Sequence, residues 1–511
     1  MRFNDITKVF MALLLALLLP GLAHAFSPTQ CAASRAGSNL GCTANDVKIT
    51  GISVVAGPAS CTGGQNITLD LDLTVLFAPG DRYDIGIFIS NDGKSPQNLP
   101  INGGAASCSV AKLPTPSILA TSPFLDLDPG PWDGTRDTCG DGNASIGGGT
   151  GSGVLRMTGV SVPCQALGST GKLYIPFVVT WDQNSSKPTS KPGTDICTSI
   201  NDLVAGTGSK CNAPTIAQGS VDVVVLPKIS KTDGLTSITP GDVTSYMITI
   251  SNSTGIELST ANSNAAVFKD PAVSNLNVSS VTCSASGGAT CPTAGTALTV
   301  ANMQGASGIT IPTMPVNSTA VFTVNAQLTG NPTGTLTNIA TVSSNSQTNS
   351  ASDVDAIVYP SLIHMKTVSV LNDPINGTVN PKNIPGAQVL YTISVANTGA
   401  GTVNPNVMTI TDAISSNLEM YIGAAGSPLT FTDGTVSSNI SYTFTSLSSG
   451  ADDIAFSNNG GSSFTYTPVP NSEGYDAAVT NIRINPKGSM AAWSGTGLYP
   501  SFSLGLKARI K

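Results

Sequence analysis

Glutamate is almost missing from this chain, and this feature restricts its fold more than any other. Charged residues make up 10% of the 511 residues, and only Glu257, Glu419 and Glu473 are glutamates. Because glutamate, lysine and arginine normally cover the surfaces of helices, the composition argues strongly against a helical protein. Threonine, serine, asparagine and valine are abundant beside 53 glycines, which is typical of short strands joined by turns. We therefore predict an all-β protein.

Histidine content and net charge restrict the function. There are two histidines, His24 and His364, and the first lies in a segment that we expect to be removed. A Ser-His-Asp or Cys-His catalytic site and a histidine-rich metal site are therefore disfavoured, and no enzyme is predicted. The net charge of -7 argues against nucleic acid as a partner, since nucleic acid binds basic surfaces.

The first 25 residues have the organisation of a signal peptide. Basic residues precede an apolar run over 9–19, and an Ala-His-Ala tripeptide at 23–25 has the form of a cleavage site, so cleavage is expected before Phe26. No later run approaches the about 20 apolar residues of a membrane-spanning helix. We expect a mature chain without a transmembrane span, exported to the cell surface, the extracellular space or the periplasm.

The cysteines indicate disulfide bonds. An even number, ten, in an exported chain is typical of a disulfide framework. Cys283 and Cys291 stand together on either side of a turn, and we predict that they pair. The pairing of the remaining eight cannot be assigned from their spacing: Cys31, Cys42, Cys61, Cys108, Cys139, Cys164, Cys197 and Cys211.

A repeated block follows the cysteine-rich segment. Pro240 and Pro385 each precede a glycine, a tyrosine stands six residues after each proline, and an asparagine stands six residues after each tyrosine. The run between tyrosine and asparagine alternates as in a half-buried strand. The closing asparagine and glycine, Asn252 and Gly255 in the first copy and Asn397 and Gly399 in the second, are interpreted as a pair that tolerates left-handed backbone. Such a strand needs a second sheet to cover it, so each copy is predicted to be an immunoglobulin-like sandwich.

The predicted chain has four segments. A signal peptide at 1–25 is followed by a cysteine-rich β domain at 26–226. Two immunoglobulin-like repeats follow, at 227–359 and, in a divergent form, at 360–511.

The repeated blocks also resemble a known family. They comprise Lys231-Thr232, Pro240 to Asn252, Phe268 to Pro271 and Leu336 to Val342. These blocks are similar to the bacterial surface repeat called domain of unknown function eleven, which the chlamydial large cysteine-rich outer-membrane protein also carries. The resemblance covers about 227–511 and implies a sandwich fold and a cell-surface location, without an activity. The second copy departs from the pattern by an insertion after Lys366 and by the lack of the closing Asn-x-Ala-Thr-Val strand.

Three polar residues of the first copy follow one another in the order of an isopeptide site. Lys231 lies on the first predicted strand, Asp270 in mid-domain and Asn338 on the last strand. In sandwich domains of Gram-positive surface proteins, such a lysine and asparagine condense into an amide, and a buried carboxyl group assists by favouring the neutral amine. The alternative is a solvated lysine, a turn aspartate and a strand-capping asparagine. Lys366 and Asp412 have no matching asparagine in the second copy.

A group of aspartates in the cysteine-rich domain forms a second candidate site. Carboxylates and carbonyls of a glycine-rich loop suit calcium, which takes about six to eight oxygen ligands. The spacing is not that of an EF-hand, and the alternative is a solvated turn region. The residues are Asp126, Asp128, Asp133, Asp137 and Asp141.

These observations predict an exported structural or adhesive protein of a bacterial cell surface. The repeats would act as a stalk or spacer, and the N-terminal domain would carry recognition or assembly. Partners are expected among cell-surface or extracellular macromolecules, including glycans and further copies of the chain. The alternatives are a calcium-dependent carbohydrate-binding module and a surface-layer or filament subunit, in which exposed sheet edges pair.

Overall fold

Strands dominate the computed structural model, which describes residues 30–99, 107–127, 139–183, 210–423 and 427–511. The helices in these ranges have four or five residues each: α2 Ala32–Ala36, α3 Ile146–Gly149, α4 Ile216–Gly219 and α5 Val300–Gln304. In the described part of the chain, no helix is long and apolar enough to cross a membrane. The all-β prediction is confirmed.

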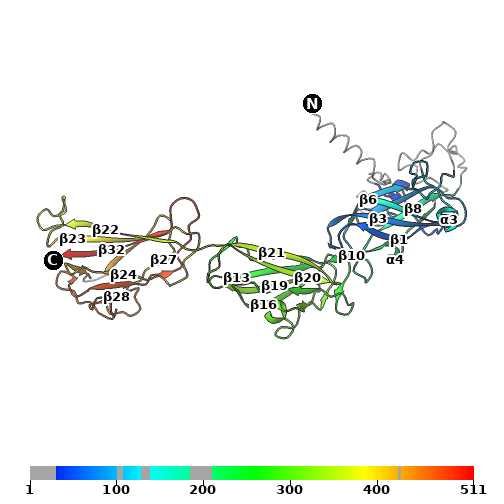
Figure 1. The fold of residues 1–511 in the computed structure, drawn as a ribbon. Helices are drawn as coiled ribbons and strands as arrows, with labels where there is room; N and C mark the ends of the chain where they lie inside the picture. Colours follow the sequence, from blue (N-terminus) through cyan, green and yellow to red (C-terminus); the bar gives the residue numbers. More distant parts are fainter. Residues whose placement is uncertain (1–29, 100–106, 128–138, 184–209, 424–426) are drawn as a thin grey trace, which may run out of the picture.

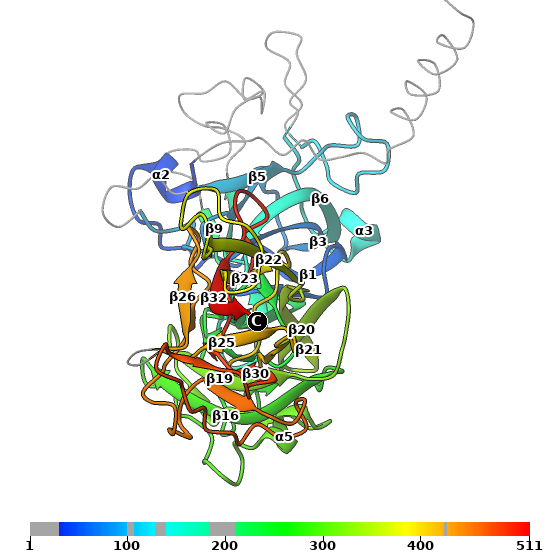
Figure 2. The same cartoon turned by 90° about the vertical axis from the view of Figure 1, so that its left-hand side faces the viewer.

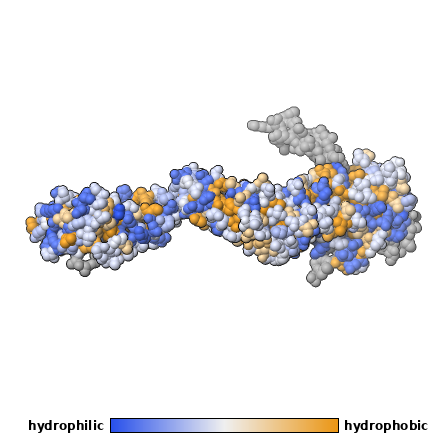
Figure 3. Space-filling view, turned by 90° about the horizontal axis from the view of Figure 1, so that it is seen from below, coloured by the Kyte–Doolittle hydropathy of each residue, from blue (hydrophilic) through white to orange (hydrophobic). Residues whose placement is uncertain are grey.

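Three β units lie in a row (Figure 1). The N-terminal β domain stands at one end, a first sandwich lies in the middle, and a second sandwich forms the other end, where the chain finishes. Seen end-on with the second sandwich nearest the viewer, the units lie behind one another (Figure 2). On the face drawn in Figure 3, apolar residues are scattered among polar ones along all three units.

The N-terminal domain contains three sheets, with strand orders β1-β3-β6, β2-β10-β7 and β5-β4-β8-β9. Every residue of β4 and β8 is buried, because these central strands of the four-stranded sheet are covered on both faces. The strands are β1 Val47–Ala56, β2 Ser60–Thr62, β3 Asn66–Phe77, β4 Tyr83–Ser90, β5 Cys108–Lys112, β6 Ser152–Pro163, β7 Lys172–Tyr174, β8 Phe177–Asp182, β9 Lys210–Asn212 and β10 Ser220–Leu226.

Disulfides hold distant parts of this domain together. The bonds link Cys31 with Cys108, Cys42 with Cys211, and Cys61 with Cys164, and Cys139 is also disulfide-bonded. In the first sandwich, Cys283 is bonded to Cys291. Bonds of this kind persist in oxidising compartments, which agrees with an exported chain.

The first sandwich packs a four-stranded sheet, ordered β11-β13-β19-β16, against a five-stranded sheet, ordered β12-β21-β20-β15-β17. Alternate residues of β13 and β19 point inward, as the period of two predicts. The stacked rings of Phe268 and Phe322 join the two sheets, with centroids 4.2 Å apart. The strands are β11 Lys228–Thr232, β12 Ser237–Ile238, β13 Val243–Ser251, β14 Leu258–Ser259, β15 Val267–Lys269, β16 Leu276–Ser286, β17 Ile309–Thr310, β18 Thr313–Met314, β19 Thr319–Leu328, β20 Thr335–Ser344 and β21 Gln347–Ile357.

The second sandwich repeats one sheet of the first in the same order. Its β22-β23-β32-β25 sheet corresponds to β11-β13-β19-β16, and it faces the smaller sheet β24-β30-β28. Strands equivalent to β20 and β21 do not occur among its described residues, as the missing Asn-x-Ala-Thr-Val block predicts. The strands are β22 Leu362–Asn372, β23 Gln388–Asn397, β24 Ile410–Ala413, β25 Leu418–Tyr421, β26 Leu429–Asp433, β27 Ile440–Ser441, β28 Ile454–Ser457, β29 Tyr475–Asp476, β30 Asn481–Ile484, β31 Lys487–Gly488 and β32 Ser501–Ile510.

Candidate functional site

Lys231 is the most unusual residue of the first sandwich. On the short strand β11, the alternation turns both Ile229 and Lys231 toward the core, and the Lys231 side chain is 0% exposed. Its ammonium nitrogen donates to Asp270 Oδ1 at 2.6 Å and lies 4.8 Å from the centre of the Tyr246 ring. A lysine in this position has lost its water, and the Asp270 carboxylate and the Tyr246 ring partly compensate for that loss.

Asp270 and Asn338 reach the same place from the opposite sheet. Strand β15 pairs with β20 so that Lys269 lies opposite Thr341, and Asp270 follows directly. Asn338 alternates with Leu336 and Ala340 on the inward face of β20, and Asp270 and Asn338 are both buried. The three residues that sequence order predicted thus lie on facing strands of one buried site, and their condensation stays a prediction.

The electrostatics of this site favour neutral groups. Burial lowers the pKa of Lys231 below its ordinary value, against the opposing effect of Asp270. Burial also raises the pKa of Asp270, against the opposing effect of Lys231. Moving one proton along their short hydrogen bond removes both buried charges.

Three buried oxygen atoms beside this pair have no hydrogen-bond partner. They are Oδ2 of Asp270, Oδ1 of Asn338 and the hydroxyl oxygen of Tyr246. A buried carbonyl oxygen without a partner costs about 1–3 kcal/mol. A proton on Asp270 would supply a donor at this site, because a neutral carboxylic acid donates where a carboxylate only accepts.

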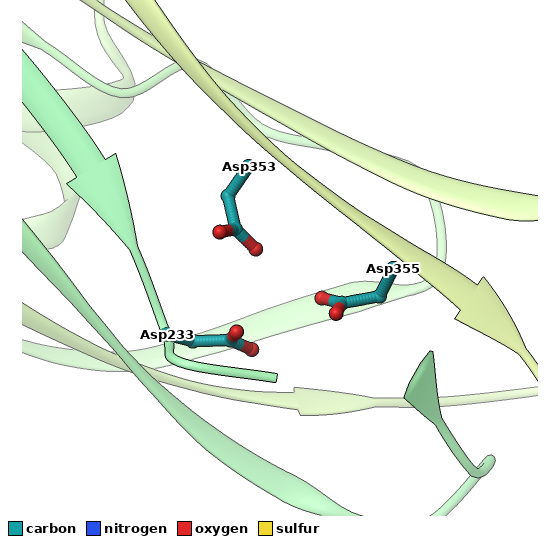
Figure 4. A group of neighbouring side chains, drawn as sticks. All are labelled: Asp233, Asp353 and Asp355. Atoms are coloured by element: carbon teal, nitrogen blue, oxygen red, sulfur yellow. The ribbon is translucent and has the colours of Figure 1, made fainter. Parts of the chain in front are cut away.

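Three further aspartates, which the sequence reasoning did not identify, adjoin the lysine. Asp233, Asp353 and Asp355 converge on one another (Figure 4), and one oxygen of each lies within 4.8 Å of the others. Asp233 follows Lys231 on the same inward side, and Asp353 lies opposite Asn338 in the β20–β21 register. The only sequence signal was the Asp-Val-Asp alternation, which places Asp353 and Asp355 on one face of β21.

Each carboxylate of this aspartate trio disfavours a negative charge on the other two. Burial and the neighbouring carboxylates raise the pKa of Asp355 to about 6. Asp233 accepts a hydrogen bond from the Thr244 hydroxyl at 2.6 Å, whereas both oxygens of the buried Asp355 have no hydrogen-bond partner. Carboxylates this close either share protons or gather around a cation. Such groupings are also common without an ion, so the trio alone defines no metal site.

The second sandwich contains the same lysine and aspartate in a different environment. Lys366 lies opposite Ile393 as Lys231 lies opposite Ile248, so the two lysines have the same register. Lys366 donates to Asp412 at 2.6 Å and lies 4.8 Å from the Tyr391 ring centre, which repeats the first site. Its side chain is nevertheless 37% exposed. The strand that would cover it, equivalent to β20, does not occur among the described residues of this sandwich.

An open groove of about 480 Å³ lies where that strand would run. Strand β22 forms one wall and the free edge of β24 the other, with Ile393 and Val395 among the residues that line it. Apolar side chains on the same face of β22 are correspondingly exposed, including Leu362 and Val368. A second pocket of about 130 Å³ borders the other side of Lys366 and Asp412.

The predicted calcium site falls largely outside the described residues. Asp128, Asp133 and Asp137 belong to that part of the chain, as does the predicted signal peptide. Asp141 is buried and accepts backbone N–H bonds from Asp84 at 3.0 Å and Leu127 at 2.7 Å, so its carboxylate joins two chain segments. Asp126 directly follows Leu125, which forms an antiparallel β-bridge with Asp141. Calcium at this cluster stays a prediction.

Comparisons with known proteins assign no family. No family model matches the chain, and no curated protein matches it, so the resemblance to the surface repeat stays a prediction. Among solved structures, it is similar to the C-terminal domain of the antigen I/II-family protein AspA of Streptococcus pyogenes, with 12% identity, coverage of 56% of this chain and 91% of that one, and a TM-score of 0.23.

Pilins also occur among the matches. The major pilin SpaD of Corynebacterium diphtheriae is 14% identical, with 62% of this chain and 66% of that one covered and a TM-score of 0.19. The major pilin subunit BcpA of Bacillus cereus is 14% identical, with 53% and 82% covered and a TM-score of 0.19. Likeness at this level assigns neither a family nor a function to the chain.

Proposed function

We propose that the protein is an exported structural or adhesive component of a bacterial cell surface, without enzymatic activity. The observation that carries the proposal is the end-to-end arrangement of one disulfide-rich β domain and two sandwiches (Figure 1). The sandwiches act as a stalk, and the N-terminal domain at its end meets the partner, since binding is normally placed on loops held by a rigid scaffold. The resemblance to the surface repeat supports the same location.

Antibodies raised against the N-terminal domain and the second sandwich would test this proposal. Intact cells of the native host should be labelled by both antibodies before permeabilisation. Cells lacking the protein serve as the control. Labelling that appears only after permeabilisation would contradict a surface location, and a periplasmic protein would give that result.

A second candidate function, a filament or surface-layer subunit, is favoured by the open groove of the second sandwich. In the first sandwich the equivalent position holds β20, whose inward face carries Leu336, Asn338, Ala340 and Val342. A strand with such an alternation would pair with the free edge of β24 and cover the exposed side chains of β22. Addition of a strand from another chain is a known mode of assembly.

A synthetic peptide with the sequence of residues 335–344 tests this candidate against the full chain. We expect saturable binding that is weakened at least tenfold when the peptide carries aspartate at the position of Ala340, because that charge would enter the core. The variant Val395→Asp should weaken binding of the unchanged peptide similarly. Equal binding of both peptides would rule out specific insertion into the groove.

A further inference from the structure

We propose that Lys231 and Asn338 form an intramolecular isopeptide bond, with Asp270 as the acid–base residue. The bond would join β11 of one sheet to β20 of the other, and so tie the first strand of the first sandwich to its penultimate strand. This inference goes beyond the proposed function and does not rest on it, because the site is internal to one sandwich.

The geometry places the reacting groups on facing sheets with little freedom to move apart. Lys231 extends from β11 across the core to Asp270, which directly follows β15 and therefore lies beside β20. The centre of the Tyr246 ring lies 4.8 Å from the ammonium nitrogen, and the Asn338 side chain adjoins the hydroxyl group of the same ring, which has no hydrogen-bond partner. Groups held this way react as an intramolecular pair. Attack of the amine on the asparagine amide is therefore favoured over attack by water, which burial largely excludes.

The unpartnered atoms are those that the reaction uses. Asp270 Oδ1 already accepts from the lysine, while its Oδ2 and the Asn338 Oδ1 have no partner. With a proton on Oδ2, Asp270 donates to the amide oxygen and polarises the carbonyl that the amine attacks. As a carboxylate, Asp270 has no proton to donate to the Asn338 oxygen, and buried polar atoms are normally hydrogen-bonded.

The step balances without any co-reactant. A proton passes from the Lys231 ammonium to Asp270, and the neutral amine nitrogen attacks Cγ of Asn338. The Nζ–Cγ bond forms and the Cγ–Nδ2 bond breaks, while Asp270 relays a second proton from Nζ to the departing nitrogen. The products are a secondary amide, ammonia and a protonated Asp270, so the buried positive charge disappears.

The second sandwich supplies an internal control. Lys366, Asp412 and Tyr391 repeat the lysine, aspartate and tyrosine, but no asparagine strand covers them and the lysine is 37% exposed. With no asparagine amide to attack, Lys366 is expected to remain unlinked in the same molecule.

Mass spectrometry of the full exported chain, reduced and denatured, tests the bond. The wild type should be lighter by about 17 Da, one ammonia, than its sequence requires. Comparing the measured mass differences between the wild type and the variants Lys231→Ala and Asn338→Ala removes any uncertainty about the mature N-terminus. Each of these variants should show its full sequence mass, whereas Lys366→Ala should keep the loss of ammonia.

Peptide mapping of the wild type makes the test independent of whether the variants fold. Lys231 and Asn338 should be recovered in one branched peptide, and Lys366 in a linear one. Separate linear peptides with Lys231 and Asn338, from a folded and oxidised chain, would overturn the proposal. A loss of about 18 Da with Lys231 joined to Asp270 would also overturn it, because water would then have left from the carboxyl group. Asp270→Asn should fold but stay unlinked, and a linked Asp270→Asn chain would remove the assigned acid–base role.

Discussion

A lysine's chemistry in this protein is decided by what covers it. Lys231 and Lys366 share register, carboxylate partner and aromatic neighbour, yet one side chain is wholly buried and the other is 37% exposed. The sequence order of lysine, aspartate and asparagine was enough to predict the first grouping. It did not reveal the aspartate trio, because the facing of β11 against β21 depends on how two sheets pack and leaves no local pattern.

The first prediction concerns Asp355. Its pKa is raised to about 6, so the native state holds a proton between about pH 4 and 6 that the unfolded state has released. This stabilisation is fully present below the unfolded-state pKa and is lost as the pH rises through about 6. Asp355→Asn removes the repulsion, and at pH 7.5 we expect it to raise the free energy of unfolding of the first sandwich by about 2 kcal/mol.

Thermal unfolding between pH 4 and pH 7.5 checks this expectation. The gain of Asp355→Asn over the wild type should shrink toward zero at pH 4. Asp222→Asn is the control, because that side chain is 89% exposed on β10. A variant less stable than the wild type at pH 7.5 would show that the carboxylate of Asp355 is needed, as it would be around a cation.

At the scale of the element, the repeated asparagine has a different role from the one its sequence pattern indicated. Asn252 and Asn397 do not adopt left-handed backbone. Both are fully buried, and their side-chain amides bind the loops that follow β13 and β23. Asn252 donates to the Ile256 and Met314 carbonyls at 2.8 and 2.6 Å. Only the following Gly255 has positive φ, so the left-handed interpretation holds for the glycine alone in the first copy.

The second prediction follows from these hydrogen bonds. Asn252→Ala leaves buried carbonyl groups without donors, and we expect a loss of about 2–4 kcal/mol in the stability of the first sandwich. Asn397→Ala should destabilise the second sandwich similarly. Hydrogen exchange distinguishes the two variants, because the protection of backbone amides should fall mainly in the sandwich that carries the substitution. Asn277→Ala, at an exposed position of β16, is the control. Unchanged protection in both variants would contradict this role.

Strands with a clear alternation of buried and exposed residues were predictable from the sequence, and strands of two residues were not. The alternating runs that became β13 and β23 follow from a half-buried face. Strands of two residues, such as β12, β14 and β17, exist only because a neighbouring strand offers an edge, which no local pattern encodes. The missing Asn-x-Ala-Thr-Val block implied the open groove. That one wall of the groove is apolar and exposed follows only from the arrangement of the two sheets.

At the scale of the whole molecule, the junction between the N-terminal domain and the first sandwich differs from the junction between the two sandwiches. One continuous hydrophobic core extends from the N-terminal domain into the first sandwich, whereas the second sandwich has a core of its own. At the first junction, Ala166 donates to the Thr254 carbonyl at 2.7 Å and Asn349 donates to Thr62 Oγ1 at 3.1 Å. We therefore expect the first two units to move as one body and the second sandwich to move about the connection near Tyr359.

The last prediction tests that rigid junction at Gly63. The Gly63 carbonyl accepts from the Ser253 hydroxyl at 2.6 Å, and a Cβ added to Gly63 would lie 2.4 Å from the Ser253 carbonyl oxygen. Because the Ser253 oxygen belongs to the backbone, it can make room for this Cβ only if the N-terminal domain and the first sandwich move apart. Gly63→Ala should therefore loosen the junction, with faster hydrogen exchange in both facing loops and a more flexible small-angle scattering profile, while each unit still unfolds within a few degrees of its wild-type temperature.

Gly51→Ala is the matched control for Gly63→Ala, because a Cβ at Gly51 meets no atom within 4 Å. Its scattering profile should be that of the wild type. If Gly63→Ala gave the same profile and the same exchange as this control, the contact between Gly63 and Ser253 would not determine the orientation of the N-terminal domain. The stiffness of the first two units would then have to come from their shared apolar core, which substitutions in the loops leave intact.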